Sequence, residues 1–276
     1  MKSFDLGGAG LPLHFLHANG YPPDCYKTLL ELFKTQYHVF GMLLRPLWGG
    51  MKPEDINDWK PFSDDLRFFL SSHSDPIIGV GHSIGAVVTL RAALRDPGKF
   101  RALILLDPVL FMPRRIVAWN LLRISGLADR VHPLIIGAKK RRRTFDDLAT
   151  VYRSYRNRNI FRYMSDENLR IHIESMTKPG MGGGYELAFS PEWEAQIYRT
   201  AARDFDLWRD LPKLDVPTLF IRGAETDTFL EDTAKLVKQK QPKVRVAALE
   251  KSTHLLPLER PKEVFDMMQS FLKEVL

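Results

Sequence analysis

The sequence predicts an α/β protein with a mostly parallel sheet and helices on both faces. Three observations lead to this prediction. Short apolar runs alternate with segments of helical periodicity, the pattern of buried parallel strands joined by helices. A pentapeptide with two glycines, residues 81–85, lies between one such run and a helical segment. A long stretch without a confident strand, residues 113–209, then interrupts the alternation.

Six apolar runs are expected to form the strands of the sheet, because glycine, proline or polar residues bound each of them. They are residues 13–16, 39–44, 76–81, 102–106, 217–221 and 244–249. The chain ends in an amphipathic segment, residues 261–276, that predicts a final helix.

The interruption predicts a second structural unit inside the first. We expect a core domain of residues 1–112 and 210–276, and a helical cap of residues 113–209. In the cap, Ser190-Pro191-Glu192 has the composition of a helix start, with an N-cap serine, a proline at the first helical position and an early acid. The cap is therefore predicted to be built from helices, with a flexible loop at residues 178–184 and no confident strand.

Composition excludes several classes of protein. The chain has 276 residues, of which 45% are hydrophobic and 26% charged, as in ordinary globular domains rather than disordered or fibrous ones. No apolar run reaches the roughly 18 residues of a membrane-spanning helix, and the N-terminus has no apolar leader segment. Cys25 is the only cysteine, which excludes an internal disulfide. The simplest expectation for the compartment is the cytoplasm.

The formal net charge of +7 comes from one part of the chain. Residues 113–170 hold 14 basic and five acidic residues, a net charge of +9, so that the rest of the chain carries −2. A solvated surface is the first interpretation of this basic cap. The alternative is weak attraction to anionic lipid or to an anionic substrate such as an acyl-CoA. Specific nucleic-acid binding is not expected, because no recognition fold accompanies the charge.

The pentapeptide Gly81-His82-Ser83-Ile84-Gly85 predicts a catalytic serine. It follows an apolar run and precedes a helical segment, which is the strand–turn–helix context of a nucleophile elbow. A tight turn exposes the serine hydroxyl and requires small residues two positions away on either side. The N–H of Ile84 would then lie at a helix N-terminus, where it can stabilise an oxyanion.

A serine of this kind needs a base and an acid that orients the base. His254 follows the last predicted strand, in the loop before the final helix, and is the expected base. The acid is expected after the preceding strand, in the loop that contains Asp227 and Glu225. Asp227 is preferred because it lies further round the turn. Glu225 and Asp107, the latter at the end of an earlier strand, remain as alternatives.

The second donor to an oxyanion is expected from the turn after the first core strand. Residues 17–22 include Asn19 and Gly20, and we expect the N–H of Asn19 to join that of Ile84, with Ala18 as the alternative to Asn19. No metal or organic cofactor is expected, because this chemistry needs none and no Cys/His cluster suggests one.

Together these motifs resemble the α/β-hydrolase superfamily, in its serine-nucleophile, capped, esterase- or lipase-like branch. The resemblance extends from about residue 11 to the end of the chain. It implies a catalytic triad of Ser83, Asp227 and His254, a sheet of about seven strands, and a cap inserted after the sixth strand. Few residues precede the first core strand, so the usual leading strand is expected to be missing. Family members with an aspartate at the elbow perform other reactions, and Ser83 favours acyl transfer to water.

The expected function is therefore hydrolysis of carboxylic esters through an acyl-serine, with lipid-like acyl substrates among the candidates. Thioester, lactone or carbon–carbon bond hydrolysis by the same triad stays open, as does a non-catalytic sensor of a small ligand. Most cap aromatics are expected to pack the cap onto the core. The candidates for a substrate pocket are Tyr21, His82, Trp119 and Phe189, although His82 is expected to pack beside the elbow rather than react. The oligomeric state is not predicted.

Overall fold

A seven-stranded sheet forms the centre of the molecule, as the sequence predicts. The structure, a computed structural model, describes residues 1–201 and 203–276. The strands follow the order β1-β3-β2-β4-β5-β9-β10 across the sheet. Their bounds are β1 (Ser3–Gly7), β2 (Leu11–Leu16), β3 (Tyr37–Met42), β4 (Ile77–His82), β5 (Phe100–Leu106), β9 (Thr218–Gly223) and β10 (Arg245–Leu249). All six apolar runs are therefore strands.

The leading strand that we expected to be missing is present. β1 pairs antiparallel with β3 at the edge of the sheet, whereas the other neighbours pair in parallel. Its side chains alternate: Ser3 and Asp5 are exposed, whereas Phe4 and Leu6 are half-buried. This short alternating pattern marks an edge strand with one face on the core, and it is weaker than the continuous apolar runs of the central strands.

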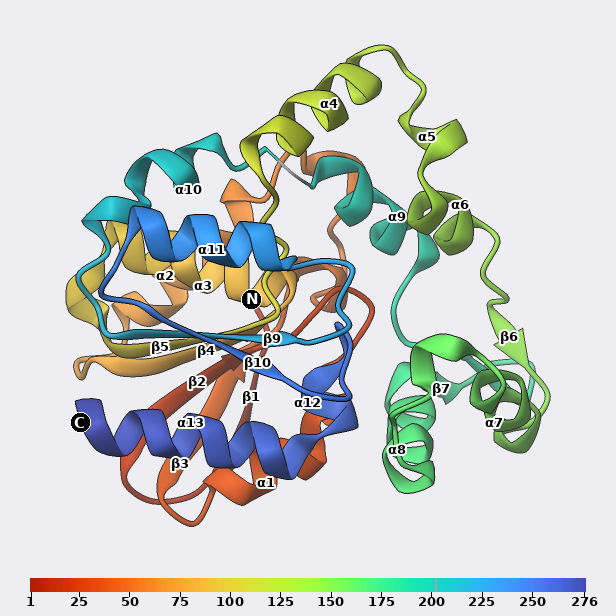
Figure 1. Cartoon of the computed structure of the whole chain (residues 1–276). Helices are drawn as coiled ribbons and strands as arrows, with labels where there is room; N and C mark the ends of the chain where they lie inside the picture. Colours follow the sequence, from red (N-terminus) through yellow and green to blue (C-terminus); the bar gives the residue numbers. More distant parts are fainter. Residues whose placement is uncertain (202) are drawn as a thin grey trace.

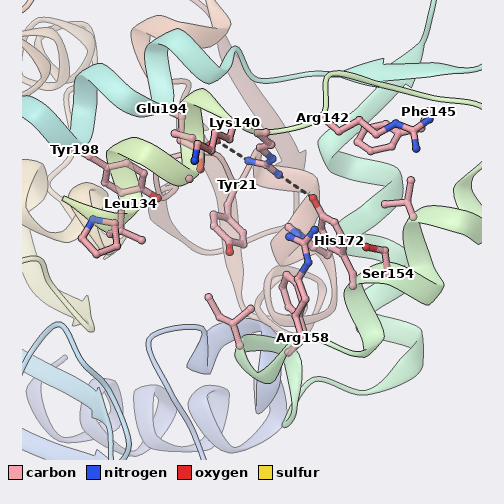
Figure 2. A pocket seen from close by; sticks show the side chains of 18 of the residues that line it. Tyr21, Leu134, Lys140, Arg142, Phe145, Ser154, Arg158, His172, Glu194 and Tyr198 are labelled. Atoms are coloured by element: carbon pink, nitrogen blue, oxygen red, sulfur yellow. Dashed lines mark hydrogen bonds and ion pairs between the residues drawn. The ribbon is translucent and has the colours of Figure 1, made fainter. Parts of the chain in front are cut away.

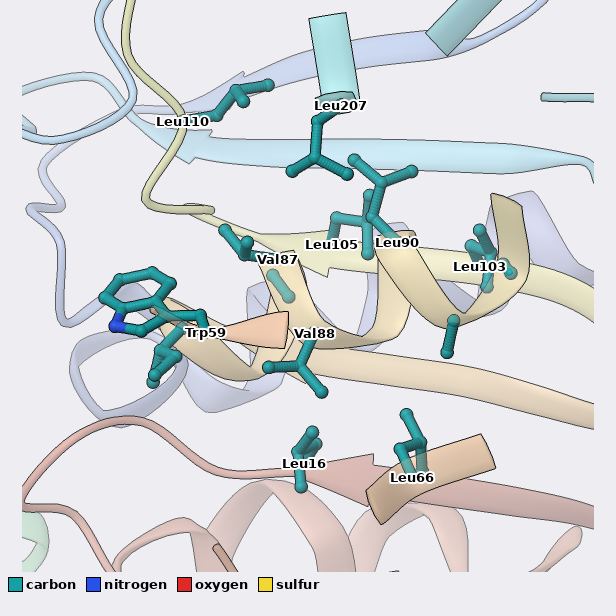
Figure 3. Packing of buried hydrophobic residues seen from close by; sticks show 14 of the residues in the cluster. Leu16, Trp59, Leu66, Val87, Val88, Leu90, Leu103, Leu105, Leu110 and Leu207 are labelled. Atoms are coloured by element: carbon teal, nitrogen blue, oxygen red, sulfur yellow. The ribbon is translucent and has the colours of Figure 1, made fainter. Parts of the chain in front are cut away.

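Helices cover both faces of the sheet (Figure 1). One face carries α2 (Lys60–Ser71), α3 (Ile84–Arg95) and α11 (Glu231–Lys240), and the other carries α1 (Lys27–Phe33) and α13 (Pro261–Val275). Strand β5 supplies side chains to both cores, since Leu103 and Leu105 pack with α3 whereas Ile104 points to the face of α13. Figure 3 shows the first of these cores, with Val87 and Val88 of α3 close to the sheet.

The cap interrupts the core after β5, which is the fifth strand of the chain rather than the predicted sixth. Its helices project away from the sheet in Figure 1. They are α4 (Pro113–Ile124), α5 (Ala128–Val131), α6 (Pro133–Lys139), α7 (Leu148–Arg156), α8 (Asp166–Met176) and α9 (Pro191–Thr200). The chain re-enters the core through α10 (Phe205–Asp210).

The cap contains strands as well as the predicted helices, although the sequence predicts no strand there. It contains a small antiparallel sheet of β6 (Thr144–Phe145), β8 (Tyr185–Leu187) and β7 (Thr177–Pro179). Strands of two or three residues leave no periodic pattern in a sequence, and so the prediction missed them. The predicted start of α9 is confirmed, because the Ser190 hydroxyl accepts hydrogen bonds from the N–H groups of Glu192 and Trp193.

Many basic residues of the cap have acidic partners. Seven of the 14 basic residues in 113–170 lie within 4.0 Å of a carboxylate oxygen. They are Arg114, Lys139, Arg141, Arg142, Arg143, Arg156 and Arg162. Part of the positive charge is therefore neutralised locally. Among the helices of the described chain, none has the length and apolar character required to cross a bilayer.

Candidate active site

Ser83 lies on a strained turn between β4 and α3. Its φ is +59°, a left-handed conformation that non-glycine residues rarely adopt. The two glycines of the pentapeptide make this turn possible. A Cβ added to Gly81 would lie 2.4 Å from the carbonyl oxygen of Gly85, and one added to Gly85 would lie 2.2 Å from that of Leu16. Larger residues would push the elbow away from the loop after β2.

His254 joins Ser83 to a buried carboxylate. Its Nε2 atom lies 2.9 Å from the Ser83 Oγ, and its Nδ1 atom lies 2.7 Å from Asp107 Oδ2. Ser83 is 6% exposed and the Asp107 side chain is fully buried, whereas the His254 side chain is 22% exposed. The three groups form a continuous line of hydrogen bonds from the buried Asp107 carboxylate through the partly exposed imidazole to the Ser83 hydroxyl. This is the geometry of a serine nucleophile with an oriented base.

The acid of this line is Asp107, and the prediction of Asp227 is wrong. Asp107 follows β5 directly, with a φ of +38°. Besides His254, its carboxylate accepts hydrogen bonds from the Gly223 N–H at 3.1 Å and the Thr226 hydroxyl at 2.6 Å. Three donors thus fix both of its oxygens. The loop after β9 provides donors to the acid rather than the acid itself.

The two carboxylates of the loop after β9 point elsewhere. Asp227 is exposed and accepts a hydrogen bond from the hydroxyl of its neighbour Thr228. Glu225 pairs with Arg162 of the cap at 2.7 Å and accepts a hydrogen bond from the Tyr163 hydroxyl at 2.6 Å. These two contacts lower the pKa of Glu225. Glu225 therefore ties the cap to the core.

A buried chain of hydrogen bonds holds the loops of the site together. The Ala18 N–H donates to the Tyr26 hydroxyl at 3.2 Å, and Tyr26 lies 2.7 Å from His82 Nδ1. The other ring nitrogen of His82, Nε2, lies 2.8 Å from the His254 carbonyl oxygen. Burial keeps the pKa of His82 well below its ordinary value, so the ring is neutral. A neutral ring that donates from Nε2 and accepts at Nδ1 satisfies every link.

A second buried acid supports the loop of His254. The Glu259 carboxylate accepts hydrogen bonds from the Thr253 N–H at 2.7 Å and from the Thr253 hydroxyl at 2.8 Å. Burial raises the pKa of Glu259. Neither Glu259 nor Tyr26 is among the residues that the sequence predicts for the site. Neither residue has a local sequence signal, because each acts on a segment that only the fold brings near.

The turn after β2 lies against the elbow, as expected for a second oxyanion donor. The would-be Cβ of Gly85 falls 2.8 Å from the His17 carbonyl oxygen, which places the start of the turn next to α3. The Ala18 N–H already donates to Tyr26, which leaves Asn19 as the better candidate of the two. Asn19 is buried, and its side-chain amide donates to the Glu194 carbonyl oxygen of α9 at 3.1 Å.

Of the four predicted pocket residues, Tyr21 lines a cavity in the cap, and the other three pack or hold structure. Phe189 is 2% exposed and belongs to the hydrophobic core, and His82 is part of the hydrogen-bond chain. The Trp119 indole N–H donates to the Ala201 carbonyl oxygen, and its ring packs edge-on against His132. In the part of the chain that the structure describes, no three His, Cys, Asp or Glu side chains are grouped to hold a metal ion.

The fold and this site define a class of protein: an α/β hydrolase with a serine elbow. Comparison with known sequences agrees, because a profile of the alpha/beta hydrolase family matches residues 15–267. The chain therefore belongs to the α/β-hydrolase family.

Several known proteins are similar to this chain over nearly their whole length. An uncharacterized hydrolase of Bacillus subtilis, YugF, is 27% identical over 262 residues, covering 90% of this chain and 85% of that protein. The crystal structure of E-2-(acetamidomethylene)succinate hydrolase superposes with a TM-score of 0.80 at 19% identity, covering 98% and 94%. A carboxylesterase structure from Nitrososphaera gargenis gives 0.70 at 20% identity, covering 99% and 94%. At such identities the two structures establish the shared fold alone.

Proposed function

We propose that the protein hydrolyses carboxylic esters through an acyl-serine intermediate at Ser83. The observation that carries this proposal is the line of hydrogen bonds from Asp107 through His254 to Ser83, at 2.7 and 2.9 Å. Membership of the family and the fold shared with a carboxylesterase support the assignment to hydrolases. The strained elbow supports it further, because backbone strain of this kind gathers at functional sites.

In the proposed acylation step the Ser83 oxygen attacks the ester carbonyl carbon while its proton passes to His254 Nε2. The tetrahedral intermediate then collapses, the carbon–oxygen bond to the alcohol breaks, and His254 returns the proton to the leaving alcohol. In deacylation, water attacks the acyl-serine by the same route, which releases the carboxylic acid and restores Ser83.

Asp107 would hold the imidazole in the productive tautomer. With Nδ1–H donated to Asp107, the lone pair of Nε2 faces the Ser83 hydroxyl, as a general base requires. The carboxylate would also stabilise the imidazolium that forms in each step. The Gly223 N–H and the Thr226 hydroxyl donate to the same carboxylate and hold it in place beside Nδ1.

The oxyanion would be stabilised by the backbone N–H groups of Ile84 and Asn19. Ile84 is the first residue of α3, so its N–H has no partner within the helix and points out of the helix N-terminus. Asn19 is held by its side-chain contact to α9. Two such donors typically contribute several kcal/mol to acyl transfer, about 3 kcal/mol for each.

The test is hydrolysis of p-nitrophenyl esters from acetyl to palmitoyl by the wild type, by Ser83→Ala and by Ser71→Ala. Ser71 is an exposed serine of α2 and serves as the matched control. We expect turnover by the wild type and by Ser71→Ala, and a loss of about 10³-fold or more in Ser83→Ala. Equal activity of Ser83→Ala and the wild type would refute the proposal.

The same triad supports other reactions, and parallel assays separate them. Thioesters, lactones and carbon–carbon bonds next to a carbonyl are all cleaved by a nucleophile of this geometry. Turnover of acyl thioesters well above that of the oxygen esters would move the assignment to thioesterase. Tight binding of a small ligand with negligible turnover of every substrate would favour a sensor on the same fold.

A further inference from the structure

A cavity of about 530 Å³ lies in the cap next to the turn after β2 (Figure 2). Its walls come from α6, α7, α8 and α9 and from the segments that follow α6 and α7, and the core contributes Tyr21. The volume is in the range of small-molecule sites, which are roughly 300 to 1,000 Å³. The cavity is therefore large enough for a substrate of moderate size.

The cavity and the proposed catalytic centre share one loop. Ser83 does not line the cavity, but Tyr21 does. Directly before Tyr21, the would-be Cβ of Gly20 lies 3.5 Å from Glu194 and 3.8 Å from Arg141, and both of these residues line the cavity. The Asn19 side chain donates to the Glu194 carbonyl oxygen. A molecule in the cavity thus contacts the loop that we expect to provide an oxyanion donor.

The lining carries an excess of positive charge. Among the described residues, four basic side chains line the cavity, and Glu194 is the only acidic one. Glu194 is neutralised by Arg141, whose guanidinium lies 2.6 Å from its carboxylate. The other three are Lys140, Arg142 and Arg158.

Two of these three cations have no carboxylate partner among the described residues. Arg158 lies over the Tyr155 ring at 4.3 Å, which holds its guanidinium at the wall of the cavity (Figure 2). Lys140 likewise makes no ion pair with a described carboxylate, whereas Arg142 lies 3.3 Å from the exposed Asp146. An anion that enters the cavity therefore meets unpaired positive charge.

The remaining wall is neutral and largely apolar. Phe145, Val151 and Phe161 are buried side chains of this wall. The Tyr21 ring stacks on His172 at 5.0 Å. Burial lowers the pKa of His172 to about 3, so this ring adds no charge at neutral pH. An apolar chain with an anionic end matches this division of the surface better than a wholly apolar chain does.

We propose that the cavity binds the acyl part of a carboxylic ester that bears a second, ionised carboxylate, and that Arg158 and Lys140 hold this carboxylate. The ester end would extend past Tyr21 toward Ser83. This inference rests on the proposed ester hydrolysis for its place in a reaction, but the binding it describes is measurable without turnover.

The probe is monomethyl suberate, compared with the uncharged dimethyl suberate, and binding is measured by calorimetry to Ser83→Ala protein. We expect the half-ester to bind about fivefold more tightly than the diester at low salt. Arg158→Gln and Lys140→Gln should each reduce this preference. The matched control is Arg153→Gln. Arg153 is an exposed arginine of α7 that does not line the cavity. Raising NaCl from about 0.05 to about 0.5 M should also weaken the preference.

The outcomes separate the two proposals. Preference for the half-ester that is lost in Arg158→Gln but kept in Arg153→Gln would support the anionic subsite. This result would hold even if the wild-type protein hydrolysed no ester. Equal binding of the two probes, no measurable binding of the half-ester, or a preference unchanged in Arg158→Gln and Lys140→Gln would overturn it. Hydrolysis of p-nitrophenyl esters by the wild type would leave ester hydrolysis in place in each of these cases.

Discussion

At the scale of single residues, the site shows which predictions a sequence supports. Ser83 and His254 were predicted because each has a local signal: the pentapeptide for the serine, and the loop after the last strand for the histidine. The acid was not predicted correctly, because two loops offer carboxylates and the choice depends on reach. β5 and β9 are neighbours in the sheet, so the loops that follow them lie side by side. Only the fold shows that Asp107 reaches the imidazole.

The first prediction follows from the contact of His254 with Asp107 rather than with Asp227. Asp107→Asn should lower kcat for p-nitrophenyl esters by about 10²- to 10⁴-fold, because an amide in place of the carboxylate favours the wrong imidazole tautomer. Asp227→Asn makes the same chemical change in the exposed loop and should stay close to the wild type. A large loss in Asp227→Asn with little change in Asp107→Asn would restore the sequence-based assignment.

Tyr26 gives a second prediction at this scale. Tyr26→Phe removes the hydroxyl between Ala18 and His82, and leaving buried polar groups without partners costs about 1–3 kcal/mol in the free energy of unfolding. Because the chain of hydrogen bonds ends on the His254 backbone, kcat should fall several-fold with little change in KM. Tyr37→Phe is the matched control, since Tyr37 donates to Gln269 away from the site. If both variants lose stability but neither loses kcat, Tyr26 has a purely structural role.

At the scale of elements, long buried strands and capped helices were predictable, and short elements were not. The six apolar runs and the start of α9 have strong signals and are present. The edge strand β1 and the three strands of the cap sheet are only two to five residues long. Such elements depend on partners that come from other parts of the chain, so tertiary pairing rather than local pattern determines them.

The elbow gives the prediction at this scale. Gly85→Ala places a Cβ 2.2 Å from the Leu16 carbonyl oxygen, so that α3 and the turn after β2 must separate. We expect a loss of about 1–3 kcal/mol in the free energy of unfolding and a clear loss of kcat. Gly98→Ala, at a site with nothing within 4 Å of the added Cβ, should change neither. Urea denaturation and the ester assay measure the two effects, and equal behaviour of the variants would contradict this account of the elbow.

At the scale of the whole molecule, stability depends on histidines that are buried without charge. Burial lowers the pKa of His14 to about 3, of His17 to about 4 and of His172 to about 3. The unfolded chain protonates these rings near their ordinary pKa of about 6.5. Between those values the unfolded state binds more protons than the folded state. The free energy of unfolding therefore falls as pH falls below about 6.5.

The fourth prediction follows from this sign. In the window from about pH 6.5 down to about pH 4, each of these histidines should remove up to about 1.4 kcal/mol per pH unit from the free energy of unfolding. Three of them together make a steep dependence. We expect Tm and the urea midpoint to be clearly lower at about pH 5 than at about pH 7. A Tm that stays constant or rises on acidification over this range would contradict the assignment of buried neutral rings.

The most direct test of the central claim is covalent labelling by a fluorophosphonate, followed by intact mass spectrometry and peptide mapping. Such a reagent requires an activated serine but no knowledge of the substrate. The Ser83 oxygen displaces fluoride from phosphorus, with His254 as the base. We predict one adduct, on Ser83, in the wild type and in Asp227→Asn at the same rate, much slower labelling in Asp107→Asn, and none in Ser83→Ala. Labelling of Ser83→Ala at the wild-type rate, or an adduct mapped to another residue, would contradict the account.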